Sequence, residues 1–373
     1  METCTLGALT PLDRLYLARA YELAARGVGS TAPNPPVGAV IVRGGYIVGE
    51  GYHHRAGEPH AETNALMQAG TAADGATLYV SLEPCVRSGR VPACAPALAS
   101  AGIARVVCGV RDPNPDNDGK GIAYLRERGI AVDVAGDRRG HELIEIFEGS
   151  IAAERPYLSL KMAMSLDGAI TSQPGVQEWI TSEAERSFVR DLRIAYDAVM
   201  VGAGTVRVDD PQLTVRPPHH RLRPFVRIVA CESDTIDAAS RILAPLEDYA
   251  PSMVLAPAGL RGTFDNLRGV ANVLFVGRPS DERLDLPAAM KALRAADVYS
   301  VLCEGGPTLG ARLIAAGVVD RFYWAIAPVL LGNERAVPVL AGVDFAALGA
   351  RLRFERTMRI GDDVVVSGTI ANV

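Results

Sequence analysis

His60-Ala61-Glu62 and the run PCVRSGRVPAC (residues 84–94) are the two stretches from which the fold of this chain is inferred. The first places a carboxylate two residues after an imidazole, and the second holds two cysteines separated by eight residues. Imidazole nitrogen and thiolate sulfur are preferred zinc ligands, and a catalytic zinc keeps one of its four positions for water. The sequence therefore predicts a catalytic zinc site formed by His60, Cys85 and Cys94.

Glu62 completes this pattern, because it stands close enough to reach water at the open position without ligating the metal. We interpret it as the group that carries protons from that water to a leaving amine. Two plainer interpretations stay open. One is a surface histidine beside two unrelated thiols, and the other is a structural zinc with His53 or His54 as its fourth ligand.

The first half of the chain alternates strand-like and helix-like segments, which predicts α/β layers. Thr10 offers a helix N-cap, followed by Pro11 and an acid in the first turn. Apolar residues then follow at helical spacing, namely Leu12, Leu15, Tyr16, Leu23 and Ala24. Gly44-Gly45 predicts a tight hairpin. We expect strands at residues 37–42, 46–51, 76–82, 104–110 and 130–134, and helices at 61–69, 92–101, 119–128 and 137–154.

The last of these helices ends at Arg155-Pro156, where the proline disfavours further helix. We place the domain boundary there, with domains at residues 1–153 and 154–373. The second half repeats the alternation, with a capping-box spacing at Ser182–Glu185. Strands are expected at 157–163, 197–201, 225–230, 252–256, 272–276, 298–303, 321–327 and 364–370, and helices at 182–196 and 307–316.

Three clusters stand out in the second half: KMAMSLDG (161–168), GAGT with a DDPQLTVR run downstream (202–216), and EGGPTLG (304–310). The last follows a strand and opens a helix, where backbone N–H groups and the helix N-terminus favour a phosphate. Each glycine-rich turn by itself is more often an ordinary tight turn. No Gly-x-Gly-x-x-Gly follows the first strand of this half, which argues against a standard Rossmann domain.

The composition narrows the class of partner. The net charge of −5 and the lack of a dense Lys/Arg stripe argue against a nucleic-acid partner. No apolar run reaches the ~18 residues of a membrane span, and METCTLGALT does not resemble a signal peptide. Six cysteines in 373 residues are too sparse for a disulfide framework. We expect a cytoplasmic enzyme without a membrane partner.

The motifs together resemble the bifunctional riboflavin-biosynthesis deaminase/reductase family. NPPVGAV (34–40), GYH (51–53), LEPC (82–85) and DPNP (112–115) carry the resemblance, as do the three clusters of the second half. The wide gap between the cysteines matches this family, whereas base and nucleoside deaminases usually have Pro-Cys-x-x-Cys. The resemblance implies an α/β protein, with an N-terminal cytidine-deaminase-like three-layer domain followed by a dihydrofolate-reductase-like domain.

It further implies one Zn²⁺ per chain, NADPH, and a homodimer or homotetramer. The first domain would deaminate a diamino-hydroxy-phosphoribosylaminopyrimidine by hydrolysis, and the second would reduce its ribosyl group to ribityl with hydride from NADPH. By resemblance the substrate contacts are Asn34, His53, Arg90, Asp112 and Asn114 in the first domain, and Lys161, Arg193, Leu213, Arg216 and Glu304 in the second. The NADPH contacts would be Met164, Trp179, Thr205, Asp209, Gly305, Gly306, Pro307, Thr308, Leu309 and Gly310.

Some positions depart from the family pattern. The family usually has Ser-His after the first cysteine and Thr-Pro-Pro before the second, where this chain has Val86, Arg87 and Val91. The stretch at 116–121 also differs, and Gln177 stands where a serine is usual. Alternatives therefore stay open: a paralogue with one inactive half or another aminopyrimidine substrate, or a non-catalytic zinc-stabilised nucleotide-binding protein. Trp179 as a core aromatic and Arg193 on a solvated helix face are the plainer interpretations of those residues.

Overall fold

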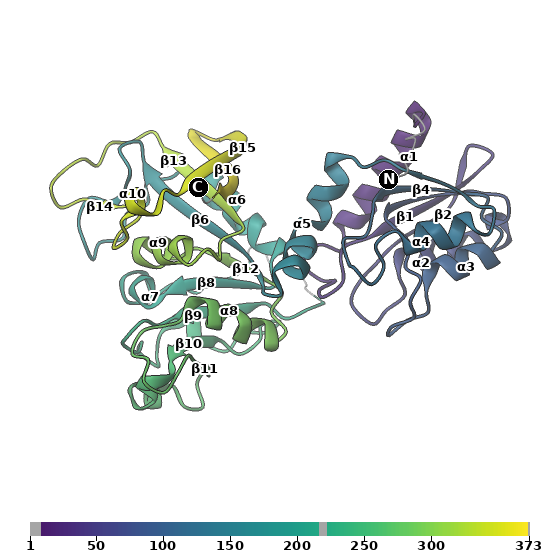
Figure 1. The fold of residues 1–373 in the computed structure, drawn as a ribbon. Helices are drawn as coiled ribbons and strands as arrows, with labels where there is room; N and C mark the ends of the chain where they lie inside the picture. Colours follow the sequence, from purple (N-terminus) through teal and green to yellow (C-terminus); the bar gives the residue numbers. More distant parts are fainter. Residues whose placement is uncertain (1–8, 216–221, 372–373) are drawn as a thin grey trace. The chain divides into compact units, whose positions relative to one another are not determined.

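The computed structural model describes residues 9–215 and 222–371. Contacts divide the chain into two compact units, Met1–Ala152 and Ala153–Val373. Each unit has a central sheet with helices on its faces (Figure 1).

The sheet of the first unit has the strand order β2-β1-β3-β4-β5. Its strands are β1 (Gly38–Arg43), β2 (Tyr46–Tyr52), β3 (Thr77–Leu82), β4 (Arg105–Val110) and β5 (Ala131–Val134). β1 pairs antiparallel with β2 and β3, and β3, β4 and β5 are parallel. The predicted hairpin turn is present, because Gly44 and Gly45 both adopt positive φ, which this turn requires.

Helices cover both faces of this sheet, giving three layers. They are α1 (Pro11–Ala25), α2 (Ala61–Ala69), α3 (Cys94–Ser100), α4 (Lys120–Arg126) and α5 (Arg138–Ala153), with the short turn η1 (Gly70–Ala73). Residues of α2, α3 and α4 pack in one core on one face, and residues of α1 pack in a separate core on the other. Gly51 lets the N-terminal end of α2 lie against β2, since a Cβ there would overlap the Ala61 carbonyl oxygen.

The predicted start of α1 is confirmed, and its predicted apolar face is partly wrong. Thr10 and Asp13 form a reciprocal capping box. Tyr16 is buried as expected, but Leu12 and Leu15 are 55% and 63% exposed. The helix instead buries the side of Asp13, whose carboxylate is paired by Arg105 and Tyr79 from the sheet.

The sheet of the second unit has the order β11-β10-β9-β8-β12-β6-β13-β16-β15. The strands are β6 (Tyr157–Ser165), β8 (Ala198–Gly202), β9 (Val226–Ala230), β10 (Met253–Pro257), β11 (Asn272–Val276), β12 (Ser300–Cys303), β13 (Arg321–Ala327), β15 (Arg351–Ile360) and β16 (Asp363–Ala371). β11 to β13 in this order are parallel, and β16 and β15 are antiparallel to their neighbours. A separate pair is formed by β7 (Ala169–Thr171) and β14 (Val337–Pro338).

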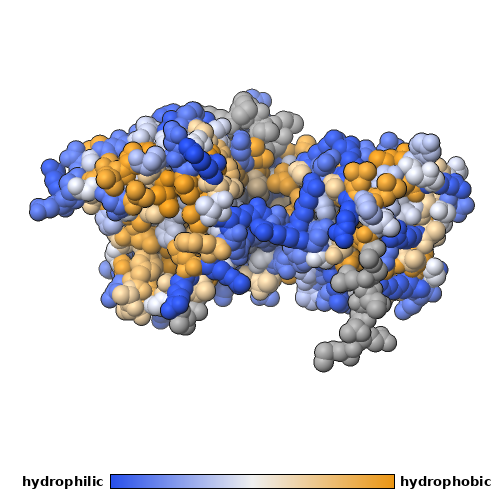
Figure 2. All heavy atoms as spheres, turned by 90° about the horizontal axis from the view of Figure 1, so that it is seen from above, coloured by the Kyte–Doolittle hydropathy of each residue, from blue (hydrophilic) through white to orange (hydrophobic). Residues whose placement is uncertain are grey.

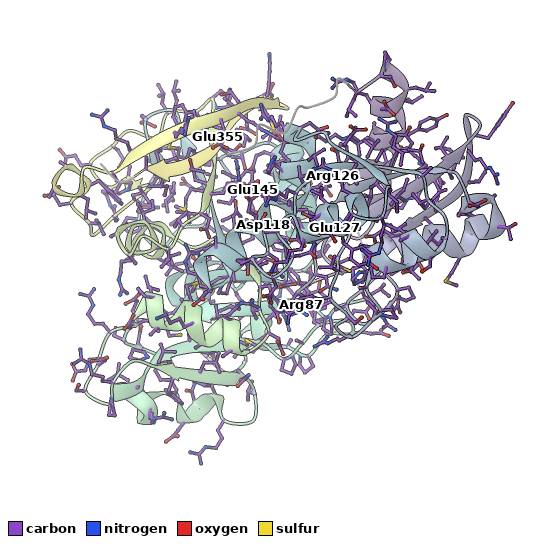
Figure 3. The ribbon with its side chains drawn as sticks, turned by 45° about the vertical axis from the view of Figure 1, so that its right-hand side comes forward. Arg87, Asp118, Arg126, Glu127, Glu145 and Glu355 are labelled. Carbon is purple, nitrogen blue, oxygen red and sulfur yellow. The ribbon has the colours of Figure 1, made fainter. Side chains whose placement is uncertain are left out.

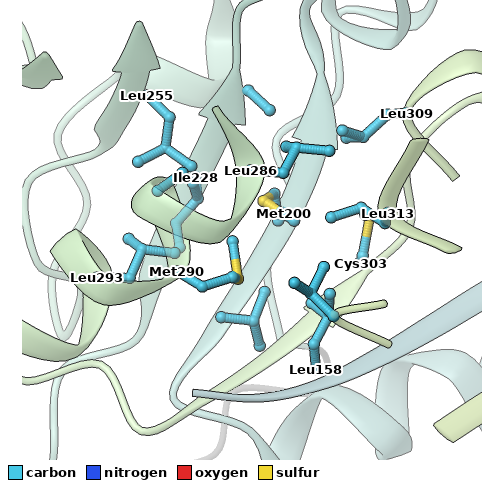
Figure 4. Close-up of a cluster of buried hydrophobic side chains, with 14 of the residues drawn as sticks. Leu158, Met200, Ile228, Leu255, Leu286, Met290, Leu293, Cys303, Leu309 and Leu313 are labelled. Carbon is cyan, nitrogen blue, oxygen red and sulfur yellow. The ribbon is translucent and has the colours of Figure 1, made fainter. Parts of the chain in front are cut away.

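Two cores lie on the two faces of this sheet. The helical elements are α6 (Glu183–Leu192), η2 (Arg193–Ala195), α7 (Ala203–Asp209), η3 (Arg241–Leu243), η4 (Ala258–Leu267), α8 (Leu286–Ala295), α9 (Pro307–Ala315) and α10 (Phe345–Leu348). Figure 4 shows the core in which Leu158, Met200 and Cys303 of the strands meet Met290 of α8 and Leu313 of α9. The opposite core is capped by α7, η3 and η4.

The predicted capping box at the start of α6 is only half formed. The Ser182 side chain accepts from the backbone N–H of Glu185, as predicted. The Glu185 side chain does not return the bond, because it pairs with Lys161, and the N–H of Ser182 instead donates to Asp363. Sequence analysis also missed α7, α8 and β15.

No helix in residues 9–215 and 222–371 is long and apolar enough to cross a membrane. Hydrophobic residues nevertheless reach the surface, where Figure 2 shows them interspersed with hydrophilic ones. Most of a folded protein's surface is contributed by apolar atoms, so this mixture is ordinary.

Candidate active sites

The three predicted zinc ligands meet in the first unit. His60 is the residue before α2, Cys85 follows β3, and Cys94 opens α3. The His60 Nδ1 atom lies 3.6 Å from the Cys85 Sγ and 3.4 Å from the Cys94 Sγ. Nitrogen and sulfur ligands about 2.1 and 2.3 Å from one tetrahedral ion lie about 3.5 Å apart. The donor set and its spacing therefore fit zinc.

The two thiols have different electrostatic environments. The backbone N–H of Cys94 donates to the Cys85 Sγ at 3.3 Å. Contact with the Cys94 side chain, and then with His60, holds the pKa of Cys85 well below its ordinary value, and the hydrogen bond with Cys85 raises the pKa of Cys94. Cys85 is thus the first thiolate of the pair.

Glu62 lies in the first turn of α2, two residues beyond His60, and is 4% exposed. Burial raises the pKa of its carboxyl to about 7. Among the described residues, the group of side chains able to hold a metal consists of His60, Cys85 and Cys94, so Glu62 stands beside the ligand set and not in it.

His53 and Asn34 form a hydrogen-bonded pair next to the ligands. The His53 Nδ1 is 3.2 Å from the Pro59 carbonyl oxygen, which can only accept, so Nδ1 carries the proton. The Nε2 then accepts from the Asn34 Nδ2 at 3.1 Å. Burial lowers the pKa of His53, which favours this neutral form. His53 therefore orients the Asn34 carboxamide with both of its ring nitrogens engaged.

Three predicted substrate contacts of the first unit, Arg90, Asp112 and Asn114, have different surroundings. Arg90 is exposed on the loop between the two cysteines. Asp112 is buried, and its carboxylate accepts from the Asn114 N–H and from the Asn117 Nδ2. Burial raises the pKa of Asp112 to about 6. Asp112 thus holds its own loop together. The Oδ1 of the half-buried Asn114 accepts from the Asp116 N–H in the same loop, and Arg90 is exposed.

In the second unit, two of the glycine-rich clusters meet at the carboxyl ends of neighbouring parallel strands. β8 and β12 are adjacent and parallel, and each leads directly into its cluster. A Cβ built on Gly306 would lie 3.4 Å from the Thr205 Oγ1, so the two turns are in contact. The carboxyl ends of parallel strands, followed by helix N-termini, are the usual place for phosphate groups.

Two of the three predicted substrate cations of the second unit, Lys161 and Arg193, are paired with carboxylates. The Lys161 Nζ lies 2.9 Å from Glu185 Oε1, with the two side chains 13% and 1% exposed. Arg193 makes a two-pronged contact with Glu304 at 2.6 and 2.8 Å and donates to the Thr214 carbonyl. Leu160 of β6 pairs with Cys303 of β12, so the residues that come next, Lys161 and Glu304, are also neighbours. The plainer interpretation of Arg193 as solvated is wrong.

The remaining predicted contacts are spread around these strand ends. Met164 lies near the end of β6, and Asp209 ends α7, with burial raising the pKa of its carboxyl. Leu213 is buried with φ of 51°, a strained conformation for leucine. Trp179 is 71% exposed, with the Arg186 guanidinium 5.3 Å from its ring centre, so it is not a core aromatic. Arg216 lies outside the described residues.

Comparison with known proteins identifies both halves. The model of the cytidine and deoxycytidylate deaminase zinc-binding region matches residues 11–110, and the model of the RibD C-terminal domain matches residues 156–366. Riboflavin biosynthesis protein RibD of Escherichia coli K12 is 39% identical over 369 residues, covering 94% of this chain and 98% of that protein. The chain belongs to the RibD family.

Solved RibD structures agree over nearly the whole length. RibD of Acinetobacter baumannii has a TM-score of 0.82 at 34% identity and covers 97% of this chain and 99% of its own. A diaminohydroxyphosphoribosylaminopyrimidine deaminase/5-amino-6-(5-phosphoribosylamino)uracil reductase of Thermotoga maritima has a TM-score of 0.80 at 30% identity, with the same coverage. The predicted cytidine-deaminase-like domain followed by a dihydrofolate-reductase-like domain is confirmed.

Membership of the RibD family confirms the predicted function class. The chain is a bifunctional deaminase and reductase of riboflavin biosynthesis, with zinc and NADPH as cofactors and a small aminopyrimidine as substrate. The hydrolase and oxidoreductase predictions hold, so the non-catalytic interpretation is set aside.

Sequence reasoning missed three buried polar residues of these RibD sites. Glu185 pairs with Lys161, while Glu83 and Asn117 bind the loops around Cys85. Glu83 could have been predicted from the LEPC motif, because an acidic residue close to a metal ligand indicates a functional position. Asn117 and Glu185 carried no such signal, because their partners are far away in the sequence.

Proposed function

We propose that residues 1–153 catalyse hydrolytic deamination of a diamino-hydroxy-phosphoribosylaminopyrimidine, and that residues 154–373 then reduce its ribosyl group to ribityl with NADPH. The observation that supports the first step most directly is the convergence of His60, Cys85 and Cys94, whose ligand atoms all lie within 4.8 Å of one another. Glu62 stands beside them from the same helix start as His60.

In the deamination, zinc held by these three side chains would supply the Lewis acidity that makes water nucleophilic near neutral pH. Glu62 takes a proton from the attacking water and gives it to the leaving amine. A C–O bond forms, the C–N bond breaks, and ammonia leaves. Asn34, oriented by His53, binds the edge of the pyrimidine ring, and Arg90 with Asn114 binds the ribose phosphate.

In the reduction, the two glycine-rich turns hold NADPH, through Thr205 and the segment from Gly305 to Gly310, with Met164, Trp179 and Asp209 at its border. NADPH, when bound, would supply a hydride for C1′ of the ring-opened imine, and water would supply the proton for the imine nitrogen. Lys161 contacts the substrate from β6, beside the Arg193–Glu304 pair. That pair, together with Leu213, shapes the wall of the substrate pocket. The protein mainly aligns donor and acceptor, because the chemistry belongs to the cofactor.

We further propose that the enzyme acts in the cytoplasm as a homodimer or homotetramer, with one zinc ion per chain and no nucleic-acid or membrane partner. The five cysteines among the described residues are all unbridged, which supports a reducing compartment. The net charge of −5 supports a small-molecule partner over nucleic acid.

Replacement of Glu62 tests the catalytic role. Glu62→Gln should keep its zinc and lose ammonia release by about 10²- to 10⁴-fold, since it removes the proton carrier and leaves the ligands. NADPH oxidation with the deaminated substrate should be unchanged. Glu58→Gln, at a carboxylate that pairs with Arg55 in the preceding loop, is the matched control and should stay fully active.

Two results would contradict the proposal. Normal ammonia release by Glu62→Gln would remove the proton-carrier role. A zinc-loaded parent that releases no ammonia from this aminopyrimidine would favour a different substrate. Following ammonia and NADPH separately also shows whether either half is inactive.

A further inference from the structure

Two loops lie against each other beside the zinc ligand Cys85: residues 83–86, after β3, and residues 112–122, which lead into α4. The buried Glu83 carboxylate joins them by accepting three backbone hydrogen bonds from the second loop, at 3.0–3.1 Å. The donors are the N–H groups of Asp112, Gly119 and Ile122. Three such bonds satisfy a buried carboxylate and restrain both loops.

Asn117 makes the second connection. Its Oδ1 accepts from the backbone N–H of Val86 at 3.1 Å, and its Nδ2 donates to the Asp112 carboxylate at 3.1 Å. The Val86 N–H can only donate and the ionised Asp112 carboxylate can only accept, so one orientation of the carboxamide serves both partners. Asn117 is 5% exposed, so neither bond is readily replaced by water.

The bond to Val86 restrains the peptide unit that directly follows Cys85. On the other side of Cys85, Gly121 of α4 lies against the Pro84 carbonyl oxygen so closely that a Cβ would overlap it. The Cys85 carbonyl itself accepts from the Ala95 N–H at 2.9 Å. The ligand is therefore restrained from both sides, and Asn117 and the Ala95 N–H together restrain the peptide unit on its C-terminal side.

We propose that Asn117 is a positioning residue for the zinc site: its carboxamide, aligned by Asp112, fixes the backbone of Val86 and thereby the Sγ of Cys85. The inference rests on the proposed function only in taking Cys85 as a zinc ligand. Hydrogen bonds that orient metal ligands typically contribute 10- to 100-fold in metal affinity.

Both segments that depart from the family pattern lie at this contact. Val86 and Arg87 depart after the first cysteine, and Asp116 and Asn117 depart after the DPNP motif. The structure pairs them: Val86 with Asn117, and Arg87 with Asp116, whose charged atoms are 2.8 Å apart. Figure 3 labels Arg87, the residue after the first loop, and Asp118 of the second loop.

The test measures the zinc affinity of the full chain by competition with a chelating dye, under conditions where the zinc-free protein is folded by circular dichroism. Asn117→Leu removes both hydrogen bonds at similar volume and should weaken zinc binding 10- to 100-fold. Asp116→Asn is the matched control. It breaks the Arg87–Asp116 pair, whose side chains are 67% and 68% exposed, and should leave zinc affinity within twofold.

A swap distinguishes positioning from a general loss of packing. Asn117→Asp alone sets two carboxylates together and should weaken zinc binding. Combined with Asp112→Asn it restores a donor facing an acceptor, keeps an acceptor for Val86, and should return the affinity to within about threefold of the parent. The Co²⁺-substituted protein gives a second readout, because its visible spectrum reports the geometry around the thiolates and should shift in Asn117→Leu.

Each outcome decides the question. Zinc affinity of Asn117→Leu equal to that of Asp116→Asn overturns the inference, and so does a swap that binds zinc as weakly as Asn117→Asp alone. Where Asn117→Leu fails to fold, the swap carries the test. A parent that binds no zinc would instead refute the proposed function.

Discussion

The ion pair between Lys161 and Glu185 allows a quantitative prediction about the reductase unit. Its atoms are 2.9 Å apart, and the Glu185 side chain is 1% exposed. Removing one partner of a buried pair leaves an uncompensated charge and costs about 3–5 kcal/mol, whereas replacing both by apolar groups is often neutral. We expect the low end, about 3 kcal/mol, for Lys161→Met and for Glu185→Leu, because the Lys161 side chain keeps 13% exposure. The double variant should lie within about 1 kcal/mol of the parent.

Urea unfolding followed by tryptophan fluorescence measures this effect in the full chain. The chain has two tryptophans, Trp179 and Trp324, and both belong to the second unit, so their signal reports that unit alone. With a slope of about 2–3 kcal/mol per molar urea, a loss of 3 kcal/mol lowers the midpoint by about 1 M or more. Ammonia release by the first unit should be unchanged in every variant.

Glu183→Gln is the matched control, two residues before Glu185 on the same helix. Glu183 pairs with Arg186 and Arg190 at the surface and is 68% exposed, so its loss should cost less than about 1 kcal/mol. A double variant as unstable as the sum of the two single variants would refute the reasoning, because it would show no coupling between the partners.

Two further predictions concern the deaminase unit. Gly121→Ala should weaken zinc binding and lower the stability of the unit by about 1–3 kcal/mol, because the new Cβ pushes α4 away from the Pro84 carbonyl; equilibrium zinc competition and thermal melts check this, and parent-like affinity would contradict it. The hydrogen bond from Arg105 holds the pKa of Asp13 well below its usual range, so this carboxylate stabilises the fold above pH about 4 and the contribution is lost as pH falls further. Asp13→Asn should therefore be less stable at pH 7 but less sensitive to acid, as measured by circular dichroism melts of the zinc-free protein at pH 7, 5 and 3; an acid sensitivity equal to the parent's would contradict this.

The elements predicted best are those whose ends are marked by local chemistry. The helix expected at residues 61–69 is α2 with the same bounds, because a turn precedes it and Gly70 follows it with positive φ. The hairpin of β1 and β2 was equally clear from Gly44-Gly45. Such signals lie within a few residues of the structure they determine, so no tertiary information is needed to use them.

The errors arose where distant contacts override the local pattern. In α1, helical spacing is compatible with burial of the face that carries Leu12 and with burial of the face that carries Asp13. Burying Asp13 looks unfavourable until Arg105 and Tyr79 are known to reach it from the sheet. β15 was missed for a related reason. Most of its residues are exposed at the edge of the sheet, and Arg356 interrupts the alternation of Leu352, Phe354, Met358 and Ile360 next to a β-bulge.

In the candidate sites too, residues selected by the chemistry were predicted, whereas contacts from residues distant in the sequence were not. Zinc restricts its ligands to a few residue types, so spacing alone indicated His60, Cys85 and Cys94. Lys161 was expected by resemblance, but no pattern indicated that a buried carboxylate from α6 would neutralise it. A phosphorylated substrate that reaches Lys161 meets an ammonium whose charge is already balanced. Under the proposed substrate contact, Lys161 would contribute directional hydrogen bonding more than net attraction.

Departures from a family pattern are informative in the same way, once their contacts are known. Taken singly, a valine after a zinc ligand and an asparagine 31 residues later are two unconnected substitutions. In the structure, the Val86 amide and the Asn117 carboxamide are donor and acceptor of one buried bond. Replacing Asn117 would leave the Val86 amide without its acceptor, at about 1–3 kcal/mol, whereas any residue except proline at position 86 keeps the donor. The backbone that carries Cys85 therefore depends on the side chain of Asn117, which lies in the other of the two departing segments.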